Sequence, residues 1–209
     1  MRWAVWLLLA ASLIGGARWF LYDRDVRHTS GVLAPAEPGI SIAPNPPTWI
    51  DPHGIRYRGL GRMEGRVVVV ARKNYSIGPF ARLAPTDLAI VWGPLSDPDL
   101  YGQLVFDQRG SPFGARYVAP ELRRGTPLSK RPHGEIAALL LGNLTHVHAI
   151  PGNADIASRL AHIRPGQVIE FTGILVDVVT PEGSRVASSL KLHDLDCEVA
   201  WIDTLELVD

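Results

Sequence analysis

The stretch Gln167-Val168-Ile169-Glu170-Phe171-Thr172-Gly173-Ile174-Leu175-Val176-Asp177-Val178-Val179 decides the fold class of this chain. Its β-branched and aromatic residues predict a long strand, and Gly173 marks a bulge or a close approach of another segment. Pro181-Glu182-Gly183-Ser184 follows as a turn, and residues 185–190 and 198–207 continue as further strands. Strands joined in this way predict an antiparallel meander or a small barrel.

A helix is predicted directly before this stretch. Asn153 or Asp155 can cap its beginning, because a short polar side chain accepts a hydrogen bond from the first turn. Apolar residues then recur at helical spacing: Ile156, Leu160 and Ile163. Pro165-Gly166 ends the helix with a turn. Residues 135–141 form either a second helix or a buried strand.

Further upstream the sequence holds two strand candidates and one ambiguous segment. Residues 66–72 are rich in valine, and residues 103–106, Gln-Leu-Val-Phe, are mostly apolar and are followed by turn-forming residues. Residues 87–92 fit a short helix or a strand, because periodicity cannot separate the two at this length. Together the elements predict an α+β fold, mainly antiparallel β with one or two helices, in one globular domain over residues 54–209.

The composition agrees with a folded domain. The 209 residues are 46% hydrophobic and 20% charged, which is typical of a globular protein. Lys and Arg number 21 and so do Asp and Glu, so the formal net charge is zero. Non-specific nucleic-acid binding needs a basic surface, and no nucleic-acid partner is therefore expected. The single cysteine, Cys197, excludes an intramolecular disulfide.

The N-terminal residues 1–24 predict a membrane segment. Arg2 precedes an apolar run from Trp3 to Gly16, a layout shared by signal peptides and membrane anchors. Gly15-Gly16-Ala17 is only a moderate cleavage site, so an uncleaved signal-anchor or transmembrane helix is favoured over a cleaved peptide or a buried helix. Counting Lys and Arg alone favours a cytoplasmic C-terminal domain, whereas the short basic start followed by an apolar run favours export.

Residues 25–53 predict a proline-rich linker between the membrane and the folded domain. Six prolines fall between Val32 and Pro52, and proline opposes both helices and central strands.

The strongest chemical motif is His146-Val147-His148. In an extended segment, residues two apart point to the same face, so both imidazoles could bind one metal ion. His193, Asp194 or Asp196 could supply a third ligand, and two histidines with a carboxylate would make a hydrolytic zinc site. The alternative is structural: Asn143, His146 and His148 form hydrogen bonds that fix the loop leading to Ile150-Pro151. We expect the structural role, and hence no cofactor, with zinc as the alternative.

Two other motifs are weaker. Ser188-Ser189-Leu190-Lys191 matches the Ser-x-x-Lys pattern of penicillin-binding enzymes, but the accompanying Ser-Asp-Asn and Lys-Thr-Gly elements are missing. Cys197 as a nucleophile would need a base, and His193 lies four residues away. Cys197 is more typical of a small residue at the start of a strand, with Glu198 beside it as a further polar candidate.

Three stretches resemble a family of uncharacterised bacterial membrane-anchored or exported proteins. They are Tyr75 with residues 83–97, residues 143–151, and residues 173–176 with Ser188-Ser189-Leu190 and Cys197-Glu198. The resemblance covers residues 60 to 207 and implies a bacterial origin and membrane association, without an activity. The sequence departs from the family pattern near Ser188, where members often have an Asp-Thr-Gly-like turn and this chain has His193-Asp194-Leu195-Asp196.

These observations predict a single-pass protein of the bacterial inner membrane with a periplasmic C-terminal domain. The expected role is a non-catalytic interaction or structural module that meets a partner protein of the envelope. The alternative is a metal-dependent hydrolase that uses the His-x-His site.

Overall fold

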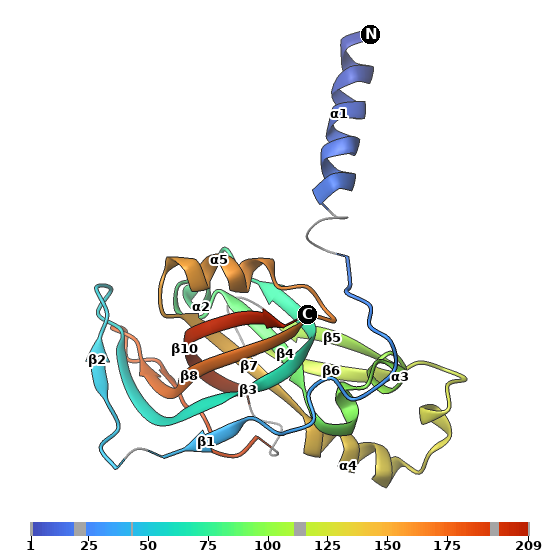
Figure 1. Ribbon diagram of the computed structural model, residues 1–209. Coiled ribbons are helices and arrows are strands. Elements are labelled where there is room, and N and C mark those ends of the chain that lie inside the picture. Colours follow the sequence, from blue (N-terminus) through green and yellow to red (C-terminus); the bar gives the residue numbers. More distant parts are fainter. Residues whose placement is uncertain (1, 19–23, 43, 111–115, 193–196, 209) are drawn as a thin grey trace.

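The computed structural model describes residues 2–18, 24–42, 44–110, 116–192 and 197–208 (Figure 1). The fold is mixed α/β, with a mostly antiparallel sheet and few helices, which confirms the general fold class predicted from the sequence.

Five strands form a closed cycle of hydrogen-bonded neighbours, which we call the ring. Their order is β3 (Arg56–Asn74), β4 (Thr86–Val91), β7 (Leu144–Pro151), β10 (Cys197–Val208) and β8 (Val168–Val179). Pairing of β3 with β8 closes the cycle. Neighbours are antiparallel except β7 and β10, which run parallel, so the meander predicted for the last third of the chain is incomplete.

One face of the ring strands carries the main hydrophobic core. Alternate residues of each strand point to this face, as expected for extended backbone. Leu88, Val147 and Ala200 represent β4, β7 and β10 in the core, and Leu192 packs into it from the loop before β10. The other face carries separate apolar clusters and the polar side chains discussed below.

Helix α5 (Ala154–His162) connects β7 to β8 and confirms the predicted helix. Asn153 is the cap, and its side-chain oxygen accepts a hydrogen bond of 3.0 Å from the Ile156 amide. Ile156 and Leu160 bury one side of the helix in the core. Gly173 in β8 lies where a side chain would meet the Trp201 carbonyl of β10, which confirms the predicted close approach.

Shorter elements fill the connections (Figure 1). Helix α2 (Pro79–Leu83) joins β3 to β4. Between β4 and β7 the chain inserts six elements: η2 (Gly93–Ser96), α3 (Pro98–Tyr101), β5 (Leu104–Gly110), β6 (Arg116–Leu122), η3 (Leu128–Lys130) and α4 (His133–Asn143). Within the described residues, strands β5 and β6 pair with each other and with no further strand. Residues 135–141, ambiguous in the sequence, belong to helix α4.

The proline-rich segment contributes two short strands to the sheet. Strand β1 (Gly39–Ser41) pairs with the middle of β3, and β2 (Thr48–Ile50) pairs with its beginning. On the opposite edge β9 (Arg185–Val186) pairs with β8 and is shorter than the predicted strand over residues 185–190.

Residues 24–41, which we call the strap, lie against the ring. The Val26 amide donates to the Pro165 carbonyl at 2.7 Å, and the His28 ring bonds to the Gly166 carbonyl at 2.8 Å. Ala34 is fully buried, and its amide donates to the Ser96 hydroxyl at 3.0 Å. The strap is therefore held along its length by contacts with distant segments.

Helix α1 (Arg2–Arg18) projects away from the rest of the molecule (Figure 1). Among the residues that the structure describes, no helix combines the length and apolar character needed to cross a membrane.

Candidate functional site

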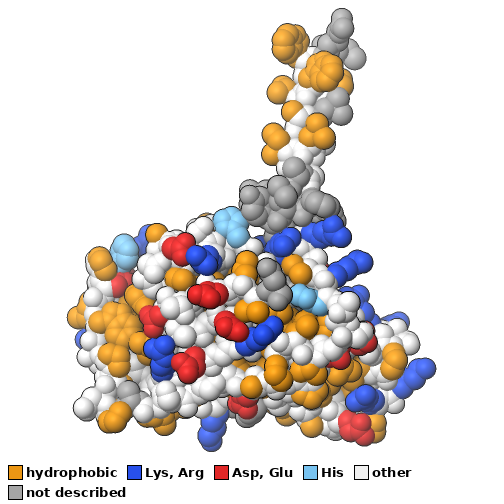
Figure 2. All heavy atoms as spheres, in the orientation of Figure 1, with side chains coloured by type: hydrophobic (Ala, Val, Ile, Leu, Met, Phe, Trp, Pro, Cys, Tyr) orange, Lys and Arg blue, Asp and Glu red, His pale blue; other side chains and the backbone are white. Residues whose placement is uncertain are grey.

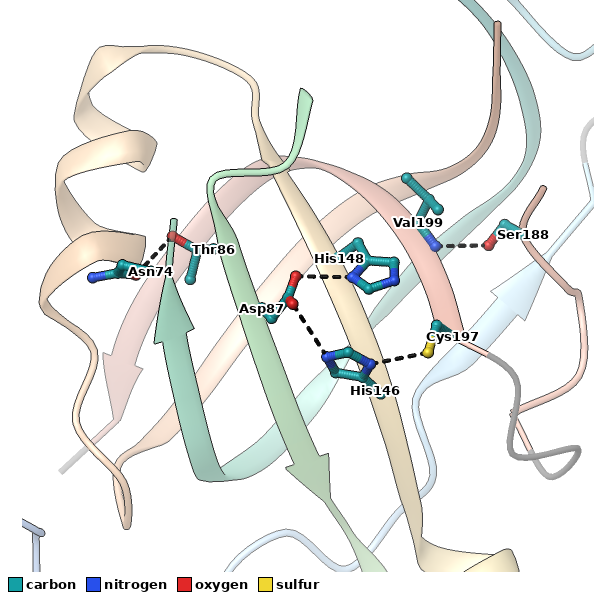
Figure 3. A network of polar contacts seen from close by, with 8 residues as sticks. All are labelled: Asn74, Thr86, Asp87, His146, His148, Ser188, Cys197 and Val199. Atoms are coloured by element: carbon teal, nitrogen blue, oxygen red, sulfur yellow. Dashed lines mark hydrogen bonds and ion pairs between the residues drawn. The ribbon is translucent and has the colours of Figure 1, made fainter. Parts of the chain in front are cut away.

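Four polar side chains meet on three adjacent strands of the ring (Figure 3). Asp87 comes from β4, His146 and His148 from β7, and Cys197 from the first position of β10. Asp87 pairs with His148 across one ladder, and Cys197 pairs with His146 across the other. Directly paired residues point to the same face of a sheet, so the register brings all four together.

Strand alternation explains why this cluster lies away from the main core. Leu88 and Val147 point into the core, so Asp87, His146 and His148 point to the opposite face. The predicted same-face arrangement of the two histidines is present, and their rings lie edge to face with centroids 4.7 Å apart.

The cluster is nearly closed to solvent. Asp87 is fully buried, the side chains of His146 and His148 are 5% and 12% exposed, and Cys197 is half-buried. A buried carboxylate is costly unless charged or hydrogen-bonded groups compensate it. The two imidazoles provide that compensation.

Asp87 contacts both histidines. The Nδ1 atom of His148 lies 2.8 Å from Oδ1 of Asp87, and because a carboxylate accepts, the imidazole donates this hydrogen bond. The Nε2 atom of His146 lies 3.7 Å from Oδ2 of Asp87, which is longer than a hydrogen bond. The other ring nitrogen of His146, Nδ1, lies 3.0 Å from the Cys197 sulfur.

This arrangement has two chemical capabilities. Ligand atoms of His146, His148 and Cys197 all lie within 4.8 Å of one another, so these three residues could hold one metal ion. The same contacts also order a thiol, an imidazole and a carboxylate in sequence, which is how enzymes activate a cysteine nucleophile.

Glu198 and Ser188 belong to a separate arrangement. Glu198 is fully buried on the core side of β10, where its Oε2 accepts from the Ser188 hydroxyl at 2.6 Å and from the Ser189 amide at 2.9 Å. The Ser188 hydroxyl also accepts from the Val199 amide at 3.0 Å. These bonds fasten the preceding loop to the start of β10, and they engage the serine hydroxyl as donor and acceptor.

The remaining predicted site residues do not join the described cluster. The Asn143 side chain donates to the Leu139 carbonyl at 2.8 Å, at the end of α4. His193, Asp194 and Asp196 lie outside the described residues, so the prediction that one of them is a metal ligand stays a prediction.

Sequence reasoning missed Asp87. The available signal was an acidic residue directly before the apolar segment from Leu88 to Trp92, where a strand would bury it and require a partner. It also named Cys197 only as a separate candidate, because the parallel pairing of β7 with β10 connects residues 51 positions apart.

A second feature is a groove of about 800 Å³ lined by residues of β2, β3, β8 and β9. Three exposed arginines line it: Arg56, Arg58 and Arg185. Arg58 forms an ion pair with Asp177. Behind the arginines Trp49 stacks on Tyr57 with ring centroids 5.2 Å apart, which supports this part of the sheet.

No protein-family model, curated protein or solved structure matches this chain. The resemblance to bacterial membrane-anchored or exported proteins therefore stays a prediction.

Proposed function

We propose that this chain is a membrane-anchored protein of the bacterial envelope whose ring acts as a non-catalytic interaction module. The ring is interpreted as a small five-stranded barrel of the kind found in oligonucleotide- and oligosaccharide-binding folds, which bind ligands on their outer surface. The groove lined by Arg56, Arg58 and Arg185 is the observation that carries the interaction role.

The anchor is proposed for residues 1–24, which place the folded domain in the periplasm at the inner membrane. In support, helix α1 presents apolar side chains along its length (Figure 2), including the exposed Trp6, Leu7 and Leu13. Such exposed apolar surface is unfavourable in water and favourable in hydrocarbon. The strap contacts would then keep the barrel close to the anchor, because few residues separate α1 from Val26.

The groove suits a partner protein with an acidic surface. Asp177 partly neutralises the charge of Arg58, whereas Arg56 and Arg185 line the groove with exposed side chains. Guanidinium groups bind carboxylates in a bidentate manner, and they contribute most where surrounding apolar surface excludes water. Ile50, which is 64% exposed at the groove, provides such apolar surface. A nucleic-acid partner is not expected, because the chain has no net charge.

Photo-crosslinking in intact cells tests this role. A photoreactive residue at Ile50 should give a discrete protein adduct, and one at the exposed Val105 of β5 serves as the matched control. The adduct should be lost in an Arg56→Ala/Arg185→Ala variant. Equal adducts from both positions, or an adduct that the arginine substitutions leave unchanged, would argue against the groove as the interaction surface.

A metal-dependent hydrolase is the second candidate. The observation that favours it is the convergence of His146, His148 and Cys197, because three protein ligands leave one position for a zinc-bound water. Full-length chain supplied with zinc should then hydrolyse activated ester or phosphoester substrates, and a His146→Ala/His148→Ala variant should not. Equal rates for both proteins would exclude hydrolysis at this site.

A further inference from the structure

We infer that His146, His148 and Cys197 bind one metal ion that accepts imidazole and thiolate ligands, such as zinc or copper. Asp87 orients both imidazoles toward this ion. The site joins β7 to β10 through its ligands and contacts β4 through Asp87. It requires neither the interaction proposed for the groove nor hydrolysis.

The donor atoms lie near the spacing that a metal requires. With metal–nitrogen bonds of about 2.0 Å and a metal–sulfur bond of about 2.3 Å, tetrahedral ligand atoms lie about 3.3 to 3.6 Å apart. In the structure these atoms all lie within 4.8 Å of one another, and Nδ1 of His146 is 3.0 Å from the Cys197 sulfur. Side-chain rotations would have to close the remaining difference, and the backbones of β7 and β10 are already paired at these positions.

Asp87 selects the ring nitrogens that face the metal. By accepting from Nδ1–H of His148, it leaves Nε2 of that ring with a lone pair for a metal. Its second oxygen faces Nε2 of His146, which favours a proton there and leaves Nδ1 to face Cys197. Figure 3 shows both rings turning one nitrogen to Asp87 and the other away from it. A carboxylate behind a ligating histidine is the usual outer partner in zinc sites.

The donor set and its burial define the class of metal. Two imidazoles and a thiolate suit zinc and copper, whereas magnesium and calcium prefer oxygen ligands. The ligands come from adjacent strands and are largely shielded from solvent, so a bound ion would fasten the first residue of β10 to the middle of the sheet. Metal binding to the folded form alone would raise stability.

Cobalt titration of the full-length chain, purified in detergent without a histidine tag, tests the site. Co²⁺ should bind stoichiometrically and give the near-ultraviolet band of a cobalt–thiolate bond with the intense visible bands of tetrahedral coordination. Zn²⁺ should displace it. The band should vanish in Cys197→Ser and stay in His162→Ala, a matched control because His162 is an exposed histidine on α5.

Asp87→Asn tests the orienting role. Loss of an outer-sphere carboxylate typically lowers metal affinity about 10- to 100-fold. The variant should therefore weaken binding to this extent while the thiolate band persists at saturating Co²⁺. Unchanged affinity would remove Asp87 from the site.

Thiol reactivity gives a second measurement that does not depend on variants. Zn²⁺ should slow alkylation of Cys197 in the full-length chain, and a chelator should restore the rate. If Zn²⁺ leaves the rate unchanged and Co²⁺ gives no thiolate band, the metal site is refuted, and the cluster is a hydrogen-bonded thiol–imidazole–carboxylate group.

Discussion

Gly166 is the residue on which the strap depends. Its φ of +89° lies in the region that favours glycine, and a Cβ atom there would lie 2.0 Å from the Val26 carbonyl oxygen. Its own carbonyl accepts from the His28 ring. The positive φ and the close approach of Val26 therefore both oppose a side chain at this position. The two effects can be measured separately.

Gly166→Ala should lower the free energy of unfolding by more than about 2 kcal/mol, because backbone strain adds to displacement of the strap. Gly183→Ala is the matched control, since Gly183 has a φ of +87° with no atom near the added Cβ. In Gly183→Ala only the backbone strain should act, so its free energy of unfolding should fall by about 1 kcal/mol. Urea unfolding of both variants gives the comparison, and equal losses would show that the Val26 contact contributes nothing.

The pKa of Tyr57 makes the stability of the folded protein depend on pH in the alkaline range. Burial first, and then the Asp51 carboxylate that accepts its hydrogen bond, raise the pKa of Tyr57 above its ordinary value. Above pH of about 10 the unfolded chain therefore releases this proton first, and the folded form loses stability as the pH rises. Tyr57→Phe should flatten this alkaline decline in unfolding experiments. An identical decline in both proteins would contradict the assignment.

At the scale of elements, local sequence signals predict individual helices and strands well, but they do not predict which distant strands pair. Helix α5 and strand β8 follow from a cap, an apolar period and a β-rich run, all contained within short windows. The pairing of β1 and β2 with β3 depends on a partner strand elsewhere in the chain. Prolines flank these two short strands, which is why the sequence alone predicts only a linker there.

The attachment of the strap depends on Ser96. Ser96 holds it, because its hydroxyl accepts from the Ala34 amide at 3.0 Å and donates to the Gly93 carbonyl at 2.7 Å. Ser96→Ala leaves buried backbone groups without this partner, which costs about 1 to 3 kcal/mol. Limited trypsin digestion should then cut faster at the exposed Arg27. Ser129→Ala, which removes a hydroxyl that donates to the nearby Thr126 carbonyl, should leave that rate unchanged.

At the scale of the whole molecule, the anchor proposed for residues 1–24 would determine where the site operates. Full-length chain should sediment with membranes and resist extraction by carbonate, whereas a chain lacking residues 1–24 should be released to the soluble fraction. Protease added to spheroplasts should digest the folded domain if it is periplasmic. Protection until the membrane is lysed would instead place that domain in the cytoplasm.

The ring also shows how far the site could be predicted from the sequence. The His146–His148 pair followed from strand period alone. Asp87 and Cys197 join it only because β4 and β10 flank β7 in a defined register. That register depends on closure by β3 and β8, and no short window of sequence contains it.

The metal content of the native protein tests the central claim about this site most directly. Full-length chain should be purified without a histidine tag or added metal, and mass spectrometry should measure zinc, copper, iron and manganese per chain. We predict about one equivalent of zinc or copper, which Cys197→Ser loses and His162→Ala retains. Metal-free folded protein that also fails to take up zinc would contradict the account.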